Sequence, residues 1–172
     1  MSKGTHAELC SRGKNWLKNA FGCQIAFEEI ETPAGEQPDA FGVKQGLTVL
    51  IEVKISKTDF ASDKKKPWRK PNEGMGQVRY FLTPKGLISP DVLPNGWGLL
   101  EATDKQIKVI KGINPKKDQL YPFSLKETKP EFLFQNRDIF AETYLLASVL
   151  RRVEIRVGDL QLFTKYDGKV TA

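Results

Sequence analysis

Residues 47–55 form a short apolar run that contains two charged side chains, and this run limits most strongly what the chain can fold into. The segment is rich in β-branched residues and has no Gly or Pro, so it predicts a buried strand. Side chains alternate along a strand, which places Glu52 and Lys54 on the face opposite Ile51 and Val53. A carboxylate and an ammonium group within a buried strand indicate a functional site.

A second strand before this one completes the local geometry. Residues 39–43 precede Gln45-Gly46, where a two-residue hairpin turn is favoured. Counting back along both strands from that turn places Asp39 opposite Glu52, with Cβ atoms about 5 Å apart. Two carboxylates so placed repel each other, and either a bound cation or protonation of one of them removes that cost. A four-residue loop keeps this register, and a three-residue loop breaks it.

Pro38-Asp39 followed by Glu52-Val53-Lys54 resembles the signature of the PD-(D/E)XK nuclease superfamily. The resemblance implies that Asp39 and Glu52 hold Mg²⁺ or Mn²⁺ with help from the Val53 carbonyl, and that Lys54 orients or activates the attacking water. The chemistry suits these residues, because Mg²⁺ prefers oxygen ligands and keeps waters, one of which can become the nucleophile. A lysine near the scissile phosphate also stabilises developing charge.

The order of the expected elements supports the resemblance. A helix-like segment, strands, the Asp, a hairpin, the Glu-x-Lys strand and a basic segment follow one another, as in the superfamily core of helix, three strands, helix and strand. Residues 54–64 also resemble the segment after the signature in MmcB-like DNA-repair nucleases and in uncharacterised phage-encoded relatives. The phage-type likeness continues to residue 100, so it covers roughly the first two thirds of the chain. We therefore expect an α/β fold with a mixed central sheet flanked by helices and a restriction-endonuclease-like core.

A basic segment follows the Glu-x-Lys strand. Seven basic and two acidic residues lie between residues 54 and 70, a local charge of +5 against a net charge of +6. Such a stripe beside a metal site suits a phosphate backbone, and a solvated lysine-rich loop is the alternative. The expected nucleic-acid contacts, to DNA above all, are Lys57, Lys64, Lys65, Lys66, Arg69, Lys70 and Arg79.

Four other residues are candidates for the same site. Glu36 is the best third carboxylate because it is close to Asp39 in sequence, and a solvated loop position is the alternative. Gln77 is a weak candidate for an outer helper of the metal site. The single histidine, His6, lies near an expected helix start, where a cap or surface role is more typical than catalysis and a substrate contact is the remaining alternative. Glu8 points away from the apolar face of that helix, so we expect it to be exposed.

The remaining elements follow from periodicity and turn residues. Helical spacing predicts a helix over residues 5–21 that ends at Gly22 and a second helix over 137–152. The apolar face of the first contains Leu9, Gly13, Trp16, Leu17 and Ala20. Strands are expected over 23–31 and 78–83, with hairpins over 96–110 and 153–163. The broad apolar surface of the second helix predicts packing on the sheet or on a partner subunit, so a homo-oligomer through 137–152 is one expectation.

Composition bounds the class of protein. The 172 residues, 40% apolar and 28% charged, suit one domain over 1–172, with a core over about 5–110 and a C-terminal helix and hairpin over 137–165. No apolar run approaches the roughly 20 residues of a membrane span, and the polar N-terminal segment does not resemble a signal peptide. Cys10 and Cys23 lack metal-ligand spacing, so a zinc site is not expected. Reduced thiols favour an intracellular protein, in a bacterial cytoplasm or a phage-infected cell.

Three functions compete on these residues. The first is a Mg²⁺- or Mn²⁺-dependent deoxyribonuclease that hydrolyses phosphodiester bonds in DNA. The second is a non-catalytic nucleic-acid-binding module, or a subunit on a nuclease fold that works only in a larger complex. The third, an edge hairpin with a Glu52–Lys57 or Asp39–Lys54 pair and no metal, is less favoured because charged residues interrupt an otherwise apolar strand. The sequence leaves open RNA against DNA, endonuclease against exonuclease, and one metal ion against two.

Overall fold

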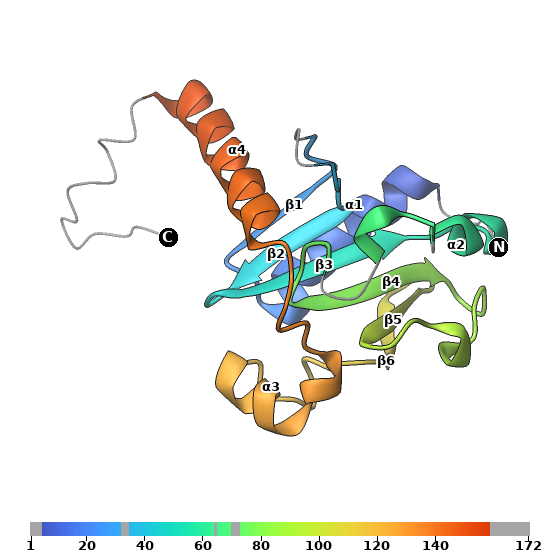
Figure 1. Cartoon of the computed structure of the whole chain (residues 1–172). Coiled ribbons are helices and arrows are strands. Elements are labelled where there is room, and N and C mark those ends of the chain that lie inside the picture. Colours follow the sequence, from blue (N-terminus) through green and yellow to red (C-terminus); the bar gives the residue numbers. More distant parts are fainter. Residues whose placement is uncertain (1–4, 32–34, 64, 70–72, 159–172) are drawn as a thin grey trace.

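A six-stranded mixed sheet forms the centre of the protein in this computed structural model, which describes residues 5–31, 35–63, 65–69 and 73–158 (Figure 1). The strands lie side by side in sequence order: β1 (Ile25–Glu28), β2 (Ala40–Lys44), β3 (Leu47–Val53), β4 (Val78–Pro84), β5 (Trp97–Ala102) and β6 (Ile107–Lys111). The first three strands are antiparallel, β3, β4 and β5 are parallel, and β5 and β6 form an antiparallel hairpin. The predicted α/β class with a mixed sheet is confirmed.

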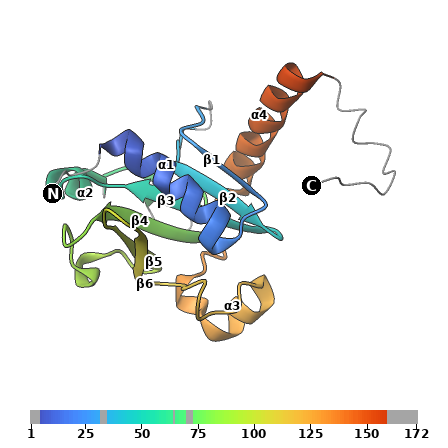
Figure 2. The same ribbon diagram turned by 180° about the vertical axis from the view of Figure 1, so that it is seen from behind.

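Four α-helices pack against this sheet. They are α1 (His6–Trp16), α2 (Lys57–Asp63), α3 (Pro122–Thr128) and α4 (Ile139–Val157). From behind, α1 crosses one face of the sheet and contacts β1 to β4 (Figure 2). The chain turns over the opposite face after β3, where α2 is followed by the short 3₁₀ turn η2 (Pro67–Arg69). Among the described residues, no helix is long and apolar enough to cross a membrane.

The core has two halves, one on each face of β3. One half contains Leu47, Val49, Ile51 and Val53 and is covered by α1. The other contains Leu50, together with residues from α2 and α4. This separation confirms the predicted alternation along β3. It also assigns Glu52 and Lys54 to the α2 face of the sheet.

The first helix differs from the prediction in its last turn. After Trp16 the chain continues as a π-helical turn, η1 (Leu17–Phe21), and ends at Gly22 with φ +79°. A π turn holds more residues than an α turn, so the side chains that follow it are rotated about the helix axis. Phe21 is therefore buried where the helical spacing predicted Ala20, and Ala20 is exposed.

The C-terminal hairpin expected from residue 153 is wrong over its first strand, because α4 continues through Val157 and is capped by Gly158. Residues 159–172 lie outside the described part of the chain. The helix projects from the sheet, and its buried residues are Ala141, Glu142 and Leu145, in its first two turns (Figure 1). Its large exposed apolar side chains are Ile139, Phe140, Tyr144, Leu150, Val153, Ile155 and Val157.

Candidate metal centre

The β2–β3 hairpin brings Asp39 to Glu52 in the predicted register. Gln45 and Gly46 both have positive φ, 48° and 81°, as a tight two-residue turn requires. The regular ladder ends with Ala40 opposite Ile51, so the next pair outward is Asp39 and Glu52. Beyond the ladder, Asp39 Oδ2 accepts a hydrogen bond of 2.7 Å from the backbone N–H of Val53, which fixes the carboxylate at the end of β3.

Asp39 also meets the first turn of α1. His6 Nε2 lies 3.5 Å from Asp39 Oδ1, and His6 Nδ1 lies 3.4 Å from Cys10 Sγ. One ligand atom from each of these three residues lies within 4.8 Å of the others. The cap of α1 is Thr5, whose hydroxyl accepts from Glu8 N–H, so the cap role considered for His6 belongs to its neighbour. Contacts between residues so far apart in sequence leave no local signal, and the expectation of a surface role missed the Asp39 contact.

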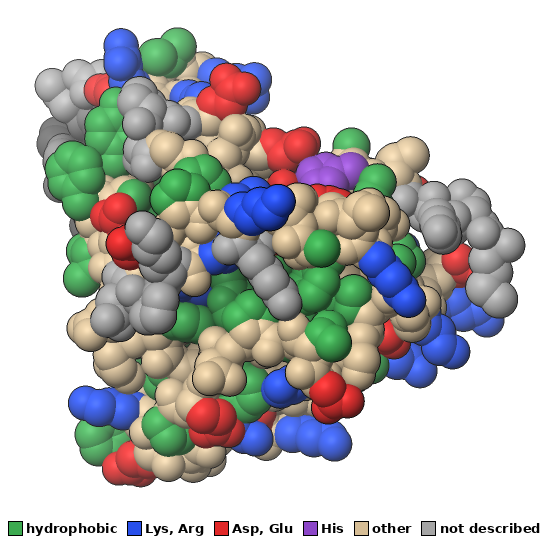
Figure 3. All heavy atoms as spheres, turned by 45° about the vertical axis from the view of Figure 1, so that its right-hand side comes forward, with side chains coloured by type: hydrophobic (Ala, Val, Ile, Leu, Met, Phe, Trp, Pro, Cys, Tyr) green, Lys and Arg blue, Asp and Glu red, His purple; other side chains and the backbone are tan. Residues whose placement is uncertain are grey.

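The chemistry of this group favours oxygen and nitrogen ligands. Burial, and then the charge of Asp39, raises the pKa of the Cys10 thiol far above its ordinary value, so the sulfur stays protonated in the metal-free site. Burial, and then the charge of Glu52, raises the pKa of Asp39 to about 6. The side chain of His6 is 39% exposed, and Figure 3 shows acidic side chains beside it at the surface. Together with Asp39, His6 therefore offers an accessible ligand pair.

Glu52 has one crowded oxygen and one bare oxygen. The residue is 1% exposed, and its Oε2 lies 2.9 Å from Arg69 Nη2, 3.4 Å from Lys54 Nζ and 3.5 Å from Lys66 Nζ. Its Oε1 is buried and has no hydrogen-bond partner among the described residues. A buried carboxylate oxygen without a partner is costly and calls for a ligand. A cation bound between Asp39 and Glu52 would supply one.

Lys54 lies in a pocket of carboxylates. Its Nζ is 3.0 Å from Asp63 Oδ1 as well as 3.4 Å from Glu52. Burial lowers the pKa of Lys54, but the charges of Glu52 and Asp63 outweigh it and leave that pKa above its ordinary value. Burial raises the pKa of Asp63, but Arg69 and Lys54 outweigh it and hold that pKa at about 2. Lys54 is therefore a fixed cation, and Asp63, from the last turn of α2, is a partner that stays charged down to about pH 2 and that the sequence did not indicate as part of the site.

Arg69 corrects one of the predicted nucleic-acid contacts. Its side chain is 5% exposed and pairs with Glu36 at 2.8 Å, Glu52 at 2.9 Å and Asp63 at 2.5 Å. Its guanidinium also lies over the ring of Trp97, 4.8 Å from the centroid. A side chain held by three carboxylates under the surface cannot bind a phosphate backbone, so Arg69 belongs to the interior of the site.

The position of Arg79 corrects a second predicted nucleic-acid contact. It is buried on β4 and donates to the backbone carbonyls of Glu73, Gly74 and Gly76 at 2.9 Å each. Its guanidinium lies 3.9 Å from the ring centroid of Phe134. Arg79 therefore ties the segment before β4 to the core, and its assignment as a phosphate contact was wrong.

The other predicted basic contacts differ among themselves. Lys57 and Lys65 are exposed, as a backbone contact requires. Lys66 is half-exposed, and its Nζ lies 3.2 Å from Asp63 as well as 3.5 Å from Glu52. Lys64 and Lys70 lie outside the described residues. The free positive charge described in this segment is therefore smaller than the sequence suggested.

Glu36 joins the site indirectly, and Gln77 does not join it. Glu36 is buried, shares Arg69 with Glu52, and accepts from the backbone N–H of Met75 at 2.5 Å. The solvated position considered for it is therefore wrong. Gln77 comes just before Val78, which pairs with Val49 at the beginning of β3, while Glu52 is near its end. The two ends are too far apart for Gln77 to support the metal site.

Replacing Glu36 with Gln is expected to flatten the pH dependence of stability. Burial raises the pKa of Glu36 from 4.5 to about 7, although the hydrogen bond from Met75 N–H and the charge of Arg69 each lower it. The folded protein thus holds a proton that the unfolded chain releases, so the free energy of unfolding falls as pH rises from 4.5 to about 7, by at most about 1.4 kcal/mol per pH unit. The raised pKa of Asp39 leaves a smaller pH dependence of the free energy of unfolding in the variant.

Urea unfolding in EDTA at pH 5, 6 and 7 measures this slope. The matched control is Glu127→Gln, on the exposed surface of α3, which should keep the parent slope. An unchanged slope in Glu36→Gln would contradict the assignment.

The comparisons with known proteins reach the fold and no further. No family model matches the chain, and no curated protein matches it. Among solved structures, it is similar to the SPO1766 protein of unknown function from Silicibacter pomeroyi, with 20% identity and a TM-score of 0.54. The match covers 87% of this chain and 89% of the other. At this identity the likeness shows a shared fold alone.

Proposed function

We propose that this protein is a Mg²⁺- or Mn²⁺-dependent nuclease that hydrolyses phosphodiester bonds in DNA on a restriction-endonuclease-like core. The observation that carries the proposal is the bare, buried Oε1 of Glu52 next to the Asp39 position, with the Lys54 ammonium 3.4 Å from the other Glu52 oxygen. Two carboxylates and a cation at the end of one hairpin match the three residues of the sequence signature in number and type.

The residues present fit a divalent ion. Asp39 and Glu52 supply the charged oxygens that Mg²⁺ and Mn²⁺ prefer, and His6 supplies an imidazole nitrogen that suits Mn²⁺. The Val53 carbonyl remains a predicted ligand, while its N–H orients Asp39. A bound ion would lower the pKa of a coordinated water and neutralise charge on the phosphate.

Lys54 acts as a fixed positive charge. In the metal-free site, burial lowers the pKa of Lys54, but the charges of Glu52 and Asp63 outweigh it and raise that pKa, so the ammonium keeps its proton. Its contribution is to hold Glu52 and to stabilise negative charge that develops on the phosphate. Arg69 and Lys66 bind the same oxygen of Glu52, so together these cations orient the carboxylate with Oε1 free.

The test is a cleavage assay on linear and circular DNA with Mg²⁺ or Mn²⁺, using Asp39→Ala, Glu52→Ala and Lys54→Ala. Each variant should lose metal-dependent cleavage, and EDTA should abolish it in the parent. Undiminished cleavage in all three variants would end the proposal.

A non-catalytic module or subunit on the same fold is the second candidate. The row of exposed apolar residues on α4 favours it, because such a surface on a projecting helix suits assembly. It predicts salt-sensitive nucleic-acid binding that survives Glu52→Ala, with no cleavage under any divalent metal. For a homo-oligomer through 137–152, light scattering should give a multiple of the 19.4 kDa chain mass, and a monomer mass would exclude it.

A further inference from the structure

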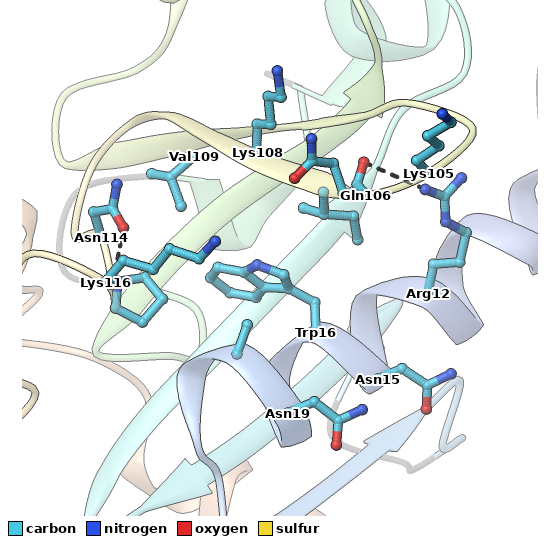
Figure 4. A pocket seen from close by; sticks show the side chains of 13 residues that line it. Arg12, Asn15, Trp16, Asn19, Lys105, Gln106, Lys108, Val109, Asn114 and Lys116 are labelled. Carbon is cyan, nitrogen blue, oxygen red and sulfur yellow. Dashed lines mark hydrogen bonds between the residues drawn. The ribbon is translucent and has the colours of Figure 1, made fainter.

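A pocket of about 620 Å³ lies between α1 and β6, on the sheet face opposite Glu52 (Figure 4). The helix side is formed by Arg12, Asn15, Trp16 and Asn19, from α1 and the π turn η1. The other side is formed by β6 with the residues just before and after it. Trp16 is a rigid floor, since it is buried and its ring packs against Phe21 and Tyr80 with centroid distances of 5.7 and 5.6 Å.

The described residues that line this pocket include basic and no acidic ones. Its cationic side chains are Arg12, Lys105 and Lys116. Lys108 also borders the pocket, but alternation along β6 places its side chain on the other face with Glu101, while Ile107 and Val109 face α1. Among the described residues, none of these three cations forms an ion pair, whereas Lys54, Lys66 and Arg69 at the metal centre are already neutralised by carboxylates. The unpaired positive charge described beside α1 is thus concentrated here.

The cations are arranged for a ligand larger than one small anion. Arg12 donates to the backbone carbonyls of Thr103 and Gln106, which holds its guanidinium at the mouth of the pocket. In Figure 4, Lys116 extends across the opening toward Trp16, Lys105 stands at the rim on the hairpin, and Lys108 points away from Trp16. Charges on separate elements around a wide opening suit several phosphates along a chain.

Amide side chains complete the lining. Asn15 and Asn19 come from the helix, and Gln106 and Asn114 come from the opposite wall. Amides donate to phosphate and sugar oxygens as well as accept, so they suit a polyester backbone. The π turn contributes Asn19 to the helix side of the pocket, which is consistent with the frequent occurrence of π turns at functional sites.

A second hollow of about 840 Å³ adjoins this pocket, because Arg12, Lys105 and Gln106 line both spaces. The second space adds the cations Lys57 and Lys85 and two acidic residues, Glu8 and Asp104. The basic lining therefore extends beyond the pocket but is mixed with carboxylates there, and the unmixed positive charge stays in the α1–β6 pocket.

We propose that the α1–β6 pocket binds the phosphodiester backbone of a nucleic-acid strand, away from the site of cleavage. The assignment rests on the proposed function in that the strand is the nuclease's substrate. It places the main backbone contact at this pocket, where no described cation pairs with a carboxylate, and not on the segment after β3, where Arg69 and Lys66 are neutralised.

Binding in EDTA tests this without cleavage. Fluorescence anisotropy of a labelled 20-mer DNA, single-stranded and duplex, compares the full-length parent with Lys105→Ala/Lys116→Ala, which removes two exposed cations of the pocket. Loss of two phosphate contacts should weaken duplex binding about 50-fold near 0.1 M salt and reduce the slope of log Kd against log salt by about 1.8 for the duplex and about 1.4 for the single strand. The control Lys126→Ala/Arg151→Ala removes the same charge from exposed positions on α3 and α4 and should bind within about threefold of the parent. Thermal midpoints confirm that both variants fold.

The outcomes separate this inference from the nuclease proposal. If the pocket variant binds like the parent, or if both variants weaken binding equally, the pocket assignment is overturned even where metal-dependent cleavage is observed. If the pocket variant alone loses affinity and no metal supports cleavage, the pocket assignment stands and the nuclease proposal falls.

Discussion

Replacing Glu52 with Gln is expected to reduce metal-dependent cleavage by about 10³-fold while leaving the protein folded. Gln keeps the volume of the side chain and a carbonyl that can accept from Arg69 and Lys54. It removes the negative charge that a divalent ion requires, and the bare Oε1 position becomes part of a neutral amide. The charge of Glu52 also raises the pKa of Asp39, because the two carboxylates repel each other. Glu52→Gln removes this repulsion above pH 6, where Asp39 is ionised, so the change in charge next to Asp39 should not destabilise the variant.

A measurement of Mn²⁺ binding by the same variant distinguishes loss of the metal ion from loss of substrate binding. In the parent, Mn²⁺ at a hundred times its Kd should stabilise the fold by about 2.7 kcal/mol. Glu52→Gln should show no such stabilisation, whereas Glu127→Gln, exposed on α3, should behave like the parent. An equal thermal shift in parent and variant, or equal cleavage, would contradict the assignment of Glu52 as a ligand.

The parts of the structure that depend on near neighbours could be predicted from the sequence. Gln45-Gly46 has the turn chemistry that fixes the β2–β3 register, so the adjacency of Asp39 and Glu52 followed by counting. Alternation along residues 47–53 likewise predicted which side chains enter each half of the core. The β5–β6 hairpin followed from two strand-like runs separated by a polar turn.

Contacts between distant segments could not be predicted in this way. Arg69 looks like one more cation in a basic run, but α2 and η2 fold that run back over the α2 face and bury its guanidinium among three acids. His6 reaches Asp39 only because α1 passes the end of β2. Local composition reports the charge of a residue, and the fold decides whether that charge faces water or a carboxylate.

Two local signals were ambiguous. Gly158 suits either a hairpin turn or a helix end, and here it ends α4. Helical spacing over 5–21 assumes 3.6 residues per turn throughout, and the π turn at Leu17–Phe21 breaks that assumption. In both helices the type of element was right near the start, and the error arose at the end, where α4 continues through Val157 and the first helix changes to a π turn.

Replacing Arg69 with Met is expected to lower the free energy of unfolding by about 3–5 kcal/mol. Met keeps much of the volume under Trp97 but leaves Glu36, Glu52 and Asp63 buried without their shared guanidinium. Lys54 and Lys66 still lie near Glu52 and Asp63, but in the described structure neither pairs with Glu36. The loss should shrink as pH falls from about 4 toward 2, because the pKa of Asp63 is about 2 in the folded parent and its stabilising charge disappears there.

Urea unfolding at pH 7 in EDTA measures the effect of Arg69→Met, and two further variants show its cause. Lys65→Met removes an exposed cation from the same segment and should change stability by less than about 0.5 kcal/mol. Arg69→Lys keeps the charge but cannot span three carboxylates with one ammonium, so it should fall between the parent and Arg69→Met. If Arg69→Met lost under 1 kcal/mol, roughly the value of a surface pair, the carboxylates would not depend on Arg69. If Arg69→Met lost the expected stability in EDTA and Mn²⁺ then restored part of that stability, the ion and Arg69 would be neutralising the same carboxylates. Arg69 would then compensate this acidic charge in the absence of metal.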